Sequence, residues 1–490
     1  GLLQETVVKL AKADSVSFGA VIEALRKKDP DSIQSVSREL EDGMMHRVLS
    51  QLAARRPKNN DGQPDIFAGY HDLQQFICIE VIRDGVSAIE LKLLSKATLA
   101  EVAKWLAADR KTTTTRRERH PGMVKMLRDL SKAAKGSAED VDRAVAAAER
   151  AFGAWSATAP AQRSLALLKL ADRLEEHAEE FAQLESVNVG KPISAAREEI
   201  PFAVDHIRFF AGAARSLEGR AAGEYEPGMT SIIRRDPLGV VGSVAPWNFP
   251  LLMGVWKICP ALLTGNTLVL KPSAQTPLTT LRLAELAADL LPEGVLNIVT
   301  GHGEPVGAAL VGHPRVRMSS LTGDVATGKA VMRAAAGNLK KVHLELGGKA
   351  PVVIFDDADI ELAVDRIREG GYANSGQDCM ASSRIYASES IHDDFLSALV
   401  PAVDSIAMGD PSSEDTEMGP VISERHQQRV KGFLDRALET GHAELAAGGE
   451  TNGRGFFVKP SIVVGAQQDD EIVKNEVFGP VVSVTRFGSD

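Results

Sequence analysis

Residues 239–250 read Gly-Val-Val-Gly-Ser-Val-Ala-Pro-Trp-Asn-Phe-Pro, an apolar β-prone run that ends in a proline-bounded turn. Similar short runs recur downstream, and stretches with helical periodicity separate them. Strands that alternate with helices are typical of a parallel sheet with crossover helices, so the sequence predicts an α/β fold. The later runs lie at residues 267–270, 294–299, 317–321 and 351–355.

The composition is that of an ordinary globular protein, because 44% of the 490 residues are hydrophobic and 25% are charged. This length predicts about two to four domains. No stretch is apolar enough for a membrane span, and the N-terminus lacks the pattern of a signal peptide, so we expect a cytoplasmic protein. Cys78, Cys259 and Cys379 have neither disulfide nor metal-ligand spacing. A reducing compartment suits a catalytic thiol.

The net charge of −10 is spread unevenly, because residues 1–130 carry +3 and residues 131–490 carry −13. An acidic body argues against nucleic acid as its partner. Residues 1–109 are predicted to form a helix-rich module of unknown role, and residues 110–136 a basic linker. A solvated connector is the favoured interpretation of that linker, because it has no aromatic side chains interleaved with its basic residues. Any nucleic-acid contact would be made through this N-terminal part.

A thiol and a carboxylate stand in two glycine-containing motifs. Cys379 ends Asn-Ser-Gly-Gln-Asp-Cys at 374–379, and Glu345 lies 34 residues earlier in Leu-Glu-Leu-Gly-Gly-Lys at 344–349. A thiolate attacks carbonyl carbons, and a nearby carboxylate can activate the water that later releases the acyl group. Taken alone, each residue has an ordinary interpretation, a packed core thiol or a solvated charge. Cys259 fits the packed-thiol interpretation better than Cys379 does.

Asn248 adds a third chemical group, because an amide side chain can donate a hydrogen bond to an oxyanion. The chain contains six motifs in this order: APWNFP at 245–250, TLVLKPS at 267–273, SLTGDVATG at 320–328, HLELGGK at 343–349, NSGQDC at 374–379 and NEVFGP at 475–480. With this series, the chain resembles the NAD(P)-dependent aldehyde dehydrogenase superfamily over about residues 137–490. Within that family, residues 320–329 and 371–379 resemble the aminobutyraldehyde (ω-aminoaldehyde) dehydrogenases.

The resemblance implies oxidation of an aldehyde, such as 4-aminobutanal, to its carboxylic acid with NAD(P)⁺. Cys379 would form a thiohemiacetal and then a thioester, Asn248 would bind the oxyanion, and Glu345 would activate water. Residues implied to bind the cofactor are Lys271, Gly323, Gly328, Leu346, Glu476, Phe478 and Trp247. For Lys271 the alternative is a salt bridge, and for Phe478 it is a structural turn. The pair of glycines alone would be weak evidence.

Cofactor choice between NAD and NADP stays open at the sequence level. Many NAD-preferring members carry Glu at the position of Ala274, where it accepts hydrogen bonds from the ribose hydroxyls. Without that carboxylate, nothing at this position excludes a 2′-phosphate. Asp324 also departs from the family pattern, and a carboxylate is unfavourable beside a phosphate unless it caps the helix facing away.

The substrate-side residues implied by the resemblance are Phe249, Met253, Trp256 and Asp378. The first three fall at spacings of four and three on the helix expected after Asn248, and an apolar stripe at that spacing is otherwise simply core. For Asp378, attraction of a substrate ammonium and a structural hydrogen bond are equally favoured.

The predicted fold is an aldehyde-dehydrogenase-like α/β fold with an extra helix-rich N-terminal module. Because the chain stops at Asp490, we expect it to lack the closing part of the cofactor domain and the final oligomerisation strand, and therefore to assemble poorly although the family forms homo-oligomers. Besides the N-terminal parts, the predicted domains are a dinucleotide-binding domain at 137–345 with an oligomerisation hairpin at 217–234, a catalytic domain at 346–465, and a segment returning to the cofactor domain at 466–490.

Two other functions fit part of the pattern. A cofactor-independent thiol hydrolase would need only Cys379, Asn248 and Glu345, but Lys271 and Glu476 argue against it because a hydrolase has no use for a dinucleotide site. An inactive truncated or fused scaffold, with its function in the N-terminal module, is the second alternative.

Overall fold

A computed structural model describes residues 136–217, 222–451 and 455–488 of the chain. The predicted module at 1–109, Cys78 and nearly all of the predicted basic linker lie outside the described residues. The account below concerns the unit that begins at Ala134.

Four helices open the described region. The first begins where the sequence predicts, because Ser137 caps it with its hydroxyl while the Asp140 carboxylate accepts from the Ser137 N–H. Val141 and Val145 lie one turn apart on this helix and are fully buried against the first sheet. The four helices are α10 (Ala138–Ser156), α11 (Pro160–Glu176), α12 (Ala178–Val189) and α13 (Ile193–Ala213).

The first sheet has five parallel strands in the order β5-β4-β3-β6-β7. The predicted runs at 239–244, 267–270, 294–299 and 317–321 are confirmed as strands. The chain builds outward from β3 to β5 and then returns to the other side of β3, so β3 and β6 flank a topological switch point, where ligands bind in open α/β sheets. The strands are β3 (Val240–Val244), β4 (Thr267–Lys271), β5 (Leu296–Ile298), β6 (Val316–Gly323) and β7 (Lys341–Leu346).

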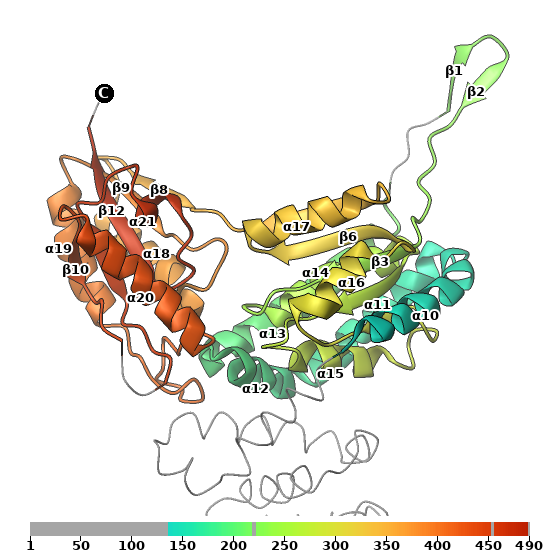
Figure 1. The fold of residues 1–490 in the computed structure, drawn as a ribbon, viewed down its shortest axis with the longest axis horizontal. Coiled ribbons are helices and arrows are strands. Elements are labelled where there is room, and N and C mark those ends of the chain that lie inside the picture. The colour runs from blue at the N-terminus through green and yellow to red at the C-terminus, as the bar shows by residue number, and fades with distance from the viewer. Residues whose placement is uncertain (1–135, 218–221, 452–454, 489–490) are drawn as a thin grey trace, which may run out of the picture. The chain divides into compact units, whose positions relative to one another are not determined.

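Helices cover both faces of this sheet (Figure 1). One face packs against α10 and α16, and the other packs against the helices that include α14 and α15. These connections are α14 (Pro250–Leu263), α15 (Leu278–Ala287), the short η1 (Gly303–Gly307), α16 (Ala308–Gly312) and α17 (Val325–Ala336). The arrangement confirms the predicted parallel-sheet α/β fold.

A second five-stranded sheet follows, coloured orange to red in Figure 1, in the order β10-β11-β12-β9-β8. Only the β10–β11 pair is antiparallel. Its strands are β8 (Pro351–Ile354), β9 (Arg384–Ser388), β10 (Glu444–Ala447), β11 (Ser461–Val464) and β12 (Val481–Phe487). Its helices are α18 (Ile360–Tyr372), η2 (Ala373–Gly376), α19 (His392–Asp404), α20 (Glu424–Glu439) and α21 (Glu471–Lys474).

One predicted boundary is wrong. Residues 466–490 were expected to return to the cofactor domain, but β12 lies between β11 and β9 in the second sheet. Its first four residues are buried, because apolar clusters cover both faces of the sheet there, with Val481 in one and Val482 and Val484 in the other. An apolar run in the sequence predicts a buried strand without indicating which sheet it joins.

The predicted hairpin at 217–234 contains an antiparallel pair, β1 (Gly223–Glu226) and β2 (Met229–Ser231). Gly228 at its turn has a φ of +78°, a conformation that glycine adopts without strain. The side chains of both strands are mostly exposed. Among the described residues, no helix has the length and apolarity that crossing a bilayer requires.

Candidate active site

The loop before Cys379 has an unusual backbone. Asn374, Ser375 and Gly376 have φ angles of 49°, 60° and 65°, so three consecutive residues are left-handed. A side chain at Gly376 would put its Cβ 2.1 Å from the Gly479 carbonyl oxygen, and only glycine fits there. The Gln377 amide holds this shape by donating to the Asn374 carbonyl at 2.9 Å. Such strain concentrates at functional sites and persists where the surrounding contacts over-determine it.

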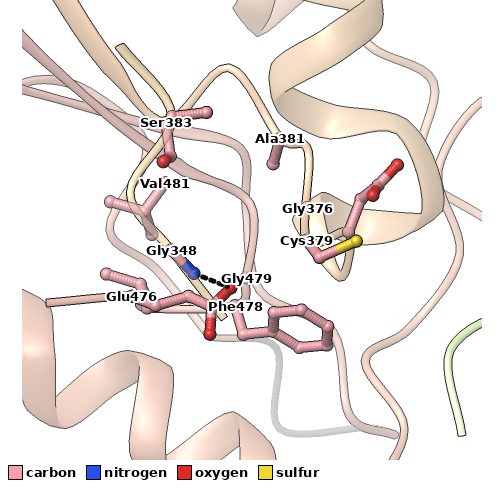
Figure 2. A pocket seen from close by; sticks show the side chains of 12 residues that line it. Gly348, Gly376, Cys379, Ala381, Ser383, Glu476, Phe478, Gly479 and Val481 are labelled. Carbon is pink, nitrogen blue, oxygen red and sulfur yellow. Dashed lines mark hydrogen bonds between the residues drawn. The ribbon is translucent and has the colours of Figure 1, made fainter. Parts of the chain in front are cut away.

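Cys379 lines a small, partly open pocket. In Figure 2, the sulfur lies beside the Phe478 ring, and the Gly348 N–H donates to the Glu476 carboxylate, a contact of 3.4 Å. The lining therefore combines residues that follow β7, residues of the Cys379 loop and the NEVFGP motif. The lining residues are Gly348, Ala350, Gly376, Asp378, Cys379, Ala381, Ser383, Glu476, Val477, Phe478, Gly479 and Val481.

Asn248 reaches the same loop from the first sheet. It follows β3 at the switch point and is buried. Its Nδ2 donates to the Gln377 carbonyl at 3.1 Å, and the Asn374 Nδ2 donates to the Asn248 carbonyl at 3.1 Å. The structure thus brings together two predicted catalytic positions, Asn248 and the loop of Cys379. Amide side chains and backbone N–H groups are the kinds of donor that stabilise an oxyanion.

The surroundings of the Cys379 thiol disfavour its thiolate form. Burial raises its pKa to about 11, and the Asp378 carboxylate adds to the effect because it repels a thiolate and accepts a hydrogen bond from the thiol. Glu476 raises the pKa further by charge. By contrast, the backbone N–H of Cys379 lowers the pKa by bonding the sulfur. The nucleophile therefore requires a change in its electrostatic environment before it reacts.

Trp247, Phe478 and His426 form an aromatic cluster at the pocket. Ring centroids of Trp247 and Phe478 lie 5.3 Å apart, and those of Trp247 and His426 lie 5.2 Å apart, both edge to face. The His426 Nε2 bonds the Phe478 carbonyl at 2.6 Å, which holds a residue whose φ is +62°. Two of the predicted cofactor residues, Trp247 and Phe478, are thus in contact. Glu476, beside them, has a pKa raised by burial.

The other predicted cofactor residues lie along the carboxyl ends of the first sheet. Lys271 ends β4, where its ammonium donates to the carbonyls of Pro272 at 2.7 Å and Gly301 at 2.9 Å. These contacts differ from the salt bridge considered as the alternative, and burial lowers the Lys271 pKa to about 8.

The glycines at the start of α17 have separate surroundings. Gly323 ends β6. A Cβ on Gly328 would lie 2.7 Å from the end of the Leu346 side chain, so a larger residue there would require that leucine to move. Asp324 caps α17 by accepting from the Thr327 N–H at 3.0 Å. From the sequence, a carboxylate at this position is expected to be acceptable beside a phosphate only if it caps the helix, and Asp324 does cap it.

Glu345 is not among the residues that line the Cys379 pocket. It lies on the exposed side of β7, where its Oε1 is 3.6 Å from the Nε2 of His343. The chain links the two places, because the segment that follows Glu345 reaches the pocket and the Gly348 N–H donates to Glu476. A Cβ at Gly347 would collide with the Glu476 carboxylate, which accounts for the first glycine of that motif.

The predicted substrate residues separate in the structure. Phe249 precedes α14 and is half-buried, with the Lys191 ammonium 4.2 Å from its ring centroid. Met253 lies in the core of the first sheet, which is the alternative interpretation of the apolar stripe. Trp256 is 37% exposed. The Asp378 carboxylate accepts a hydrogen bond from the Met380 N–H at 2.9 Å. This is a structural bond inside the loop that carries Cys379.

Sequence reasoning missed two groups near the site. His426 is a single histidine at the start of α20, and no motif indicates it. Lys191 is buried between the carboxylates of Glu185 and Glu199, and burial raises the Glu185 pKa to about 8. Lys191, Glu185 and Glu199 are charged residues within a largely apolar helical region of the sequence. That pattern could have predicted a buried charged group.

The fold and the site define an oxidoreductase class: a doubly wound sheet of the nucleotide-binding kind joined to a domain that presents a thiol beside an amide donor. Residues 120–490 match the Aldehyde dehydrogenase family, and the chain belongs to that family. It is an NAD(P)-dependent aldehyde dehydrogenase.

Curated relatives and solved structures agree with this assignment. Betaine aldehyde dehydrogenase of Bacillus subtilis is 40% identical over 370 residues, which cover 74% of this chain and 75% of the relative. Betaine aldehyde dehydrogenase of Staphylococcus aureus in complex with NAD⁺ superposes with a TM-score of 0.71 at 42% identity, over 72% of each chain. The structure of PnpE with nicotinamide adenine dinucleotide has a TM-score of 0.71 at 44% identity, over 72% of this chain and 74% of that one.

Proposed function

We propose that this enzyme oxidises a small cationic aldehyde, an ω-aminoaldehyde such as 4-aminobutanal, to its carboxylic acid through a thioester on Cys379. The observation that carries the proposal is the contact between Asn248 and the Cys379 loop. The Asn248 amide donates to the Gln377 carbonyl, two residues before Cys379, so an amide donor and the thiol meet at the same loop.

The residues divide the reaction between them. The Cys379 thiol gives its proton to solvent water and its sulfur bonds the aldehyde carbon, while the Asn248 amide and the Cys379 N–H stabilise the resulting oxyanion. Loss of hydride from that carbon re-forms the carbonyl as a thioester. Glu345 then takes a proton from water, the hydroxide adds to the thioester, and the carbon–sulfur bond breaks to give acid and thiolate.

NAD(P)⁺ supplies the hydride acceptor when it is bound. The residues present fit a dinucleotide in chemical type: the α17 N-terminus follows β6 beside the switch point, where backbone N–H groups suit a pyrophosphate. Lys271 ends the neighbouring β4, and its ammonium is suited to bind ribose hydroxyls. The Glu476 carboxylate accepts a long hydrogen bond of 3.4 Å from the Gly348 N–H and could also accept from a ribose hydroxyl. Ala274, just after β4, supplies no carboxylate against a 2′-phosphate, so both cofactors stay in the proposal.

A cationic substrate is supported by the charges at the pocket. Burial is the largest cause of the raised Cys379 pKa, and the Asp378 and Glu476 carboxylates raise it further by their charge, so two negative groups lie near the sulfur. An ammonium bound there would lower the thiol pKa and so favour the nucleophile. Betaine aldehyde, named in several relatives, also carries a positive charge and is the second candidate.

Reduced cofactor measured by absorbance at about 340 nm tests the proposal. The matched panel is 4-aminobutanal, betaine aldehyde and the uncharged butanal, each with NAD⁺ and NADP⁺. We expect a higher kcat/KM for the two cations than for butanal, and activity reduced to background by Cys379→Ser, because a serine hydroxyl is far less nucleophilic.

Three outcomes would contradict the proposal. A preference for butanal would contradict the proposal that the substrate is cationic. Turnover retained by Cys379→Ser would contradict the proposal that the reaction passes through a thioester on Cys379. Hydrolysis of a thioester or ester probe in the absence of cofactor, with no aldehyde oxidation, would support the thiol hydrolase instead. The cytoplasmic location and the state of assembly stay predictions from the sequence.

A further inference from the structure

Two carboxyl groups and one ammonium meet in the interior of the helices that open the described region. Lys191, between α12 and α13, forms a close ion pair with Oε2 of Glu199 on α13. The same ammonium lies 3.7 Å from Oε1 of Glu185 on α12. All three side chains are buried, and that of Glu185 is fully buried.

The charges of this cluster balance only if one carboxyl group carries a proton. One ammonium neutralises one carboxylate, and a second buried carboxylate without a counter-charge is strongly unfavourable. Glu199 has the direct ion pair, so Glu185 is the group that lacks a counter-charge. Oε2 of Glu185 and Oε1 of Glu199 are both buried without a hydrogen-bond partner in the described part of the chain, but only Glu199 has its other oxygen on the ammonium. A neutral acid at Glu185 removes the uncompensated charge.

The electrostatics of Glu185 agree with this count. Burial, and then the charge of Glu199, raise the pKa of Glu185 to about 8. The charge of Lys191, the Thr279 hydroxyl and the Leu251 N–H act in the opposite direction. Burial and the neighbouring carboxylate therefore outweigh the groups that favour ionisation.

Glu185 also contacts the start of α14. Phe249 is the N-cap residue of this helix and provides no capping side chain, and Pro250 has no N–H to offer. The first N–H inside the helix belongs to Leu251, and it donates to Oε1 of Glu185 at 3.5 Å. A carboxyl group from α12 thus supplies the cap that the sequence before α14 does not.

Lys191 contacts the residue on the other side of Pro250. Its ammonium lies 4.2 Å from the ring centroid of Phe249, a cation–π contact. Asn248 directly precedes Phe249, and its amide donates to the Gln377 carbonyl in the Cys379 loop. The cluster therefore lies against the two residues that follow Asn248 into the helix, Phe249 by its ring and Leu251 by its N–H.

We propose that Glu185 is a positioning residue for Asn248: it is protonated at neutral pH, and its carbonyl oxygen caps the helix that begins after Asn248. The inference rests on the proposed role of Asn248 as an oxyanion donor. A neutral acid accepts the Leu251 N–H without placing a second negative charge beside Glu199. Ionisation adds that charge in the interior and weakens the packing that holds the start of α14.

The charges that reach Glu185 from the elements packed against α12 are those of Glu199 and Lys191. The lysine and arginine side chains on α13, α14 and α15 have partners of their own. Arg197 pairs with Glu179, Arg208 with Glu175 and Arg282 with Glu180, and Lys257 donates to Ser320. The pH dependence below therefore concerns Glu185 within its own cluster.

Unfolding in urea tests the protonation, with Glu185→Gln as a variant that keeps the shape and the acceptor but cannot ionise. The pKa of Glu185 is raised in the folded chain from its usual 4.5, so its proton stabilises the fold fully below about pH 4.5, and this contribution is lost as the pH rises to about 8. The unfolding constant of the parent, relative to that of Glu185→Gln, should rise about tenfold per pH unit between about pH 5 and 8 and then level off.

A ratio that stays constant over this pH range would overturn the proposal. Infrared difference spectra of the parent and Glu185→Gln at pH 7 give a second measurement. They should show the C=O band of a carboxylic acid in the parent alone, and its absence would also overturn the proposal.

The burst of reduced cofactor with 4-aminobutanal at pH 7, which reports acylation, tests the positioning role. Glu185→Leu removes the acceptor of the Leu251 N–H, and we expect a burst about ten- to a hundredfold slower with unchanged cofactor affinity. Glu185→Gln should keep the burst rate within about twofold. Glu198→Gln, which removes an exposed carboxylate from α13, is the control and should do the same.

Equal burst rates in Glu185→Leu and Glu185→Gln would overturn the positioning role. Should Glu185→Leu not fold, the pH profile decides: the burst rate of the parent relative to Glu185→Gln should fall about tenfold between about pH 7 and 9, and an unchanged ratio would overturn the role. A normal burst in Asn248→Ala would instead refute the proposed role of Asn248, whatever the Glu185 variants do.

Discussion

The reactivity of Cys379 follows from its electrostatic surroundings. With a pKa of about 11, only ~0.03% of the thiol is ionised at pH 7.5, compared with ~10% for an unperturbed cysteine of pKa about 8.5. Because the thiolate is the reacting form, alkylation of the free enzyme should be about 300-fold slower than that of an exposed peptide cysteine. Its rate should rise tenfold per pH unit until the pH approaches 11.

Asp378→Asn perturbs this balance with little change in shape. The asparagine oxygen can still accept from the Met380 N–H, so the loop keeps its 2.9 Å bond while the negative charge is removed. Burial is the largest cause of the raised pKa and is unchanged by the substitution. We therefore expect only a partial recovery, of about one pKa unit, and alkylation about tenfold faster at pH 7.5.

The assay is iodoacetamide labelling followed by peptide mass spectrometry, from about pH 6 to 10.5. Cys259 is the internal control, because it is 1% exposed and should stay unlabelled in the folded enzyme. A midpoint below about pH 8.5 in the parent enzyme would refute the argument from burial and charge. Equal rates in the parent and Asp378→Asn would refute the contribution of Asp378.

Three further predictions test other parts of the molecule. Glu345→Gln should keep the burst of reduced cofactor but slow the steady state about 100-fold or more, as stopped-flow absorbance would show; loss of the burst would place Glu345 elsewhere in the reaction. Ala274→Glu should raise the NAD⁺ to NADP⁺ ratio of kcat/KM about ten- to a hundredfold, and an unchanged ratio would show that this position does not face the ribose. Gly376→Ala should lower the free energy of unfolding by about 2–5 kcal/mol in urea denaturation, because Gly376 has a positive φ and its Cβ would collide with the Gly479 carbonyl. Gly153→Ala, which has open space around it in α10, should raise the free energy of unfolding by about 1 kcal/mol. Equal stability of the two variants would contradict this account.

The first sheet was largely predictable because its strands are buried on both faces and therefore appear as continuous apolar runs. The strand β7 is different. Lys341–Leu346 alternates polar and apolar residues because it forms the edge of the sheet with one open face, and its motif was interpreted for its chemistry instead. β12 was predictable as a strand but not in its place, since parallel pairing with β9 and β11 is not encoded in its own residues.

The candidate site was predictable where a residue lies within a motif. Asn248 and the Cys379 loop do meet, as the chemistry of an amide and a thiol suggested. The separation of Glu345 from the pocket lining could not be foreseen, because spacing in the sequence does not determine the face of an edge strand. His426 was missed for a similar reason: a single histidine has meaning only through neighbours that the fold supplies.

The bond from Asn248 to Gln377 spans 129 residues and joins loops that belong to different sheets. Neither sheet alone contains both the nucleophile and its amide donor, so a half-folded chain on the ribosome has no competent thiol chemistry. In refolding from urea, recovery of aldehyde oxidation should therefore lag behind the recovery of secondary structure. The delay measures how long the two sheets take to join, and catalysis reports the last step of folding.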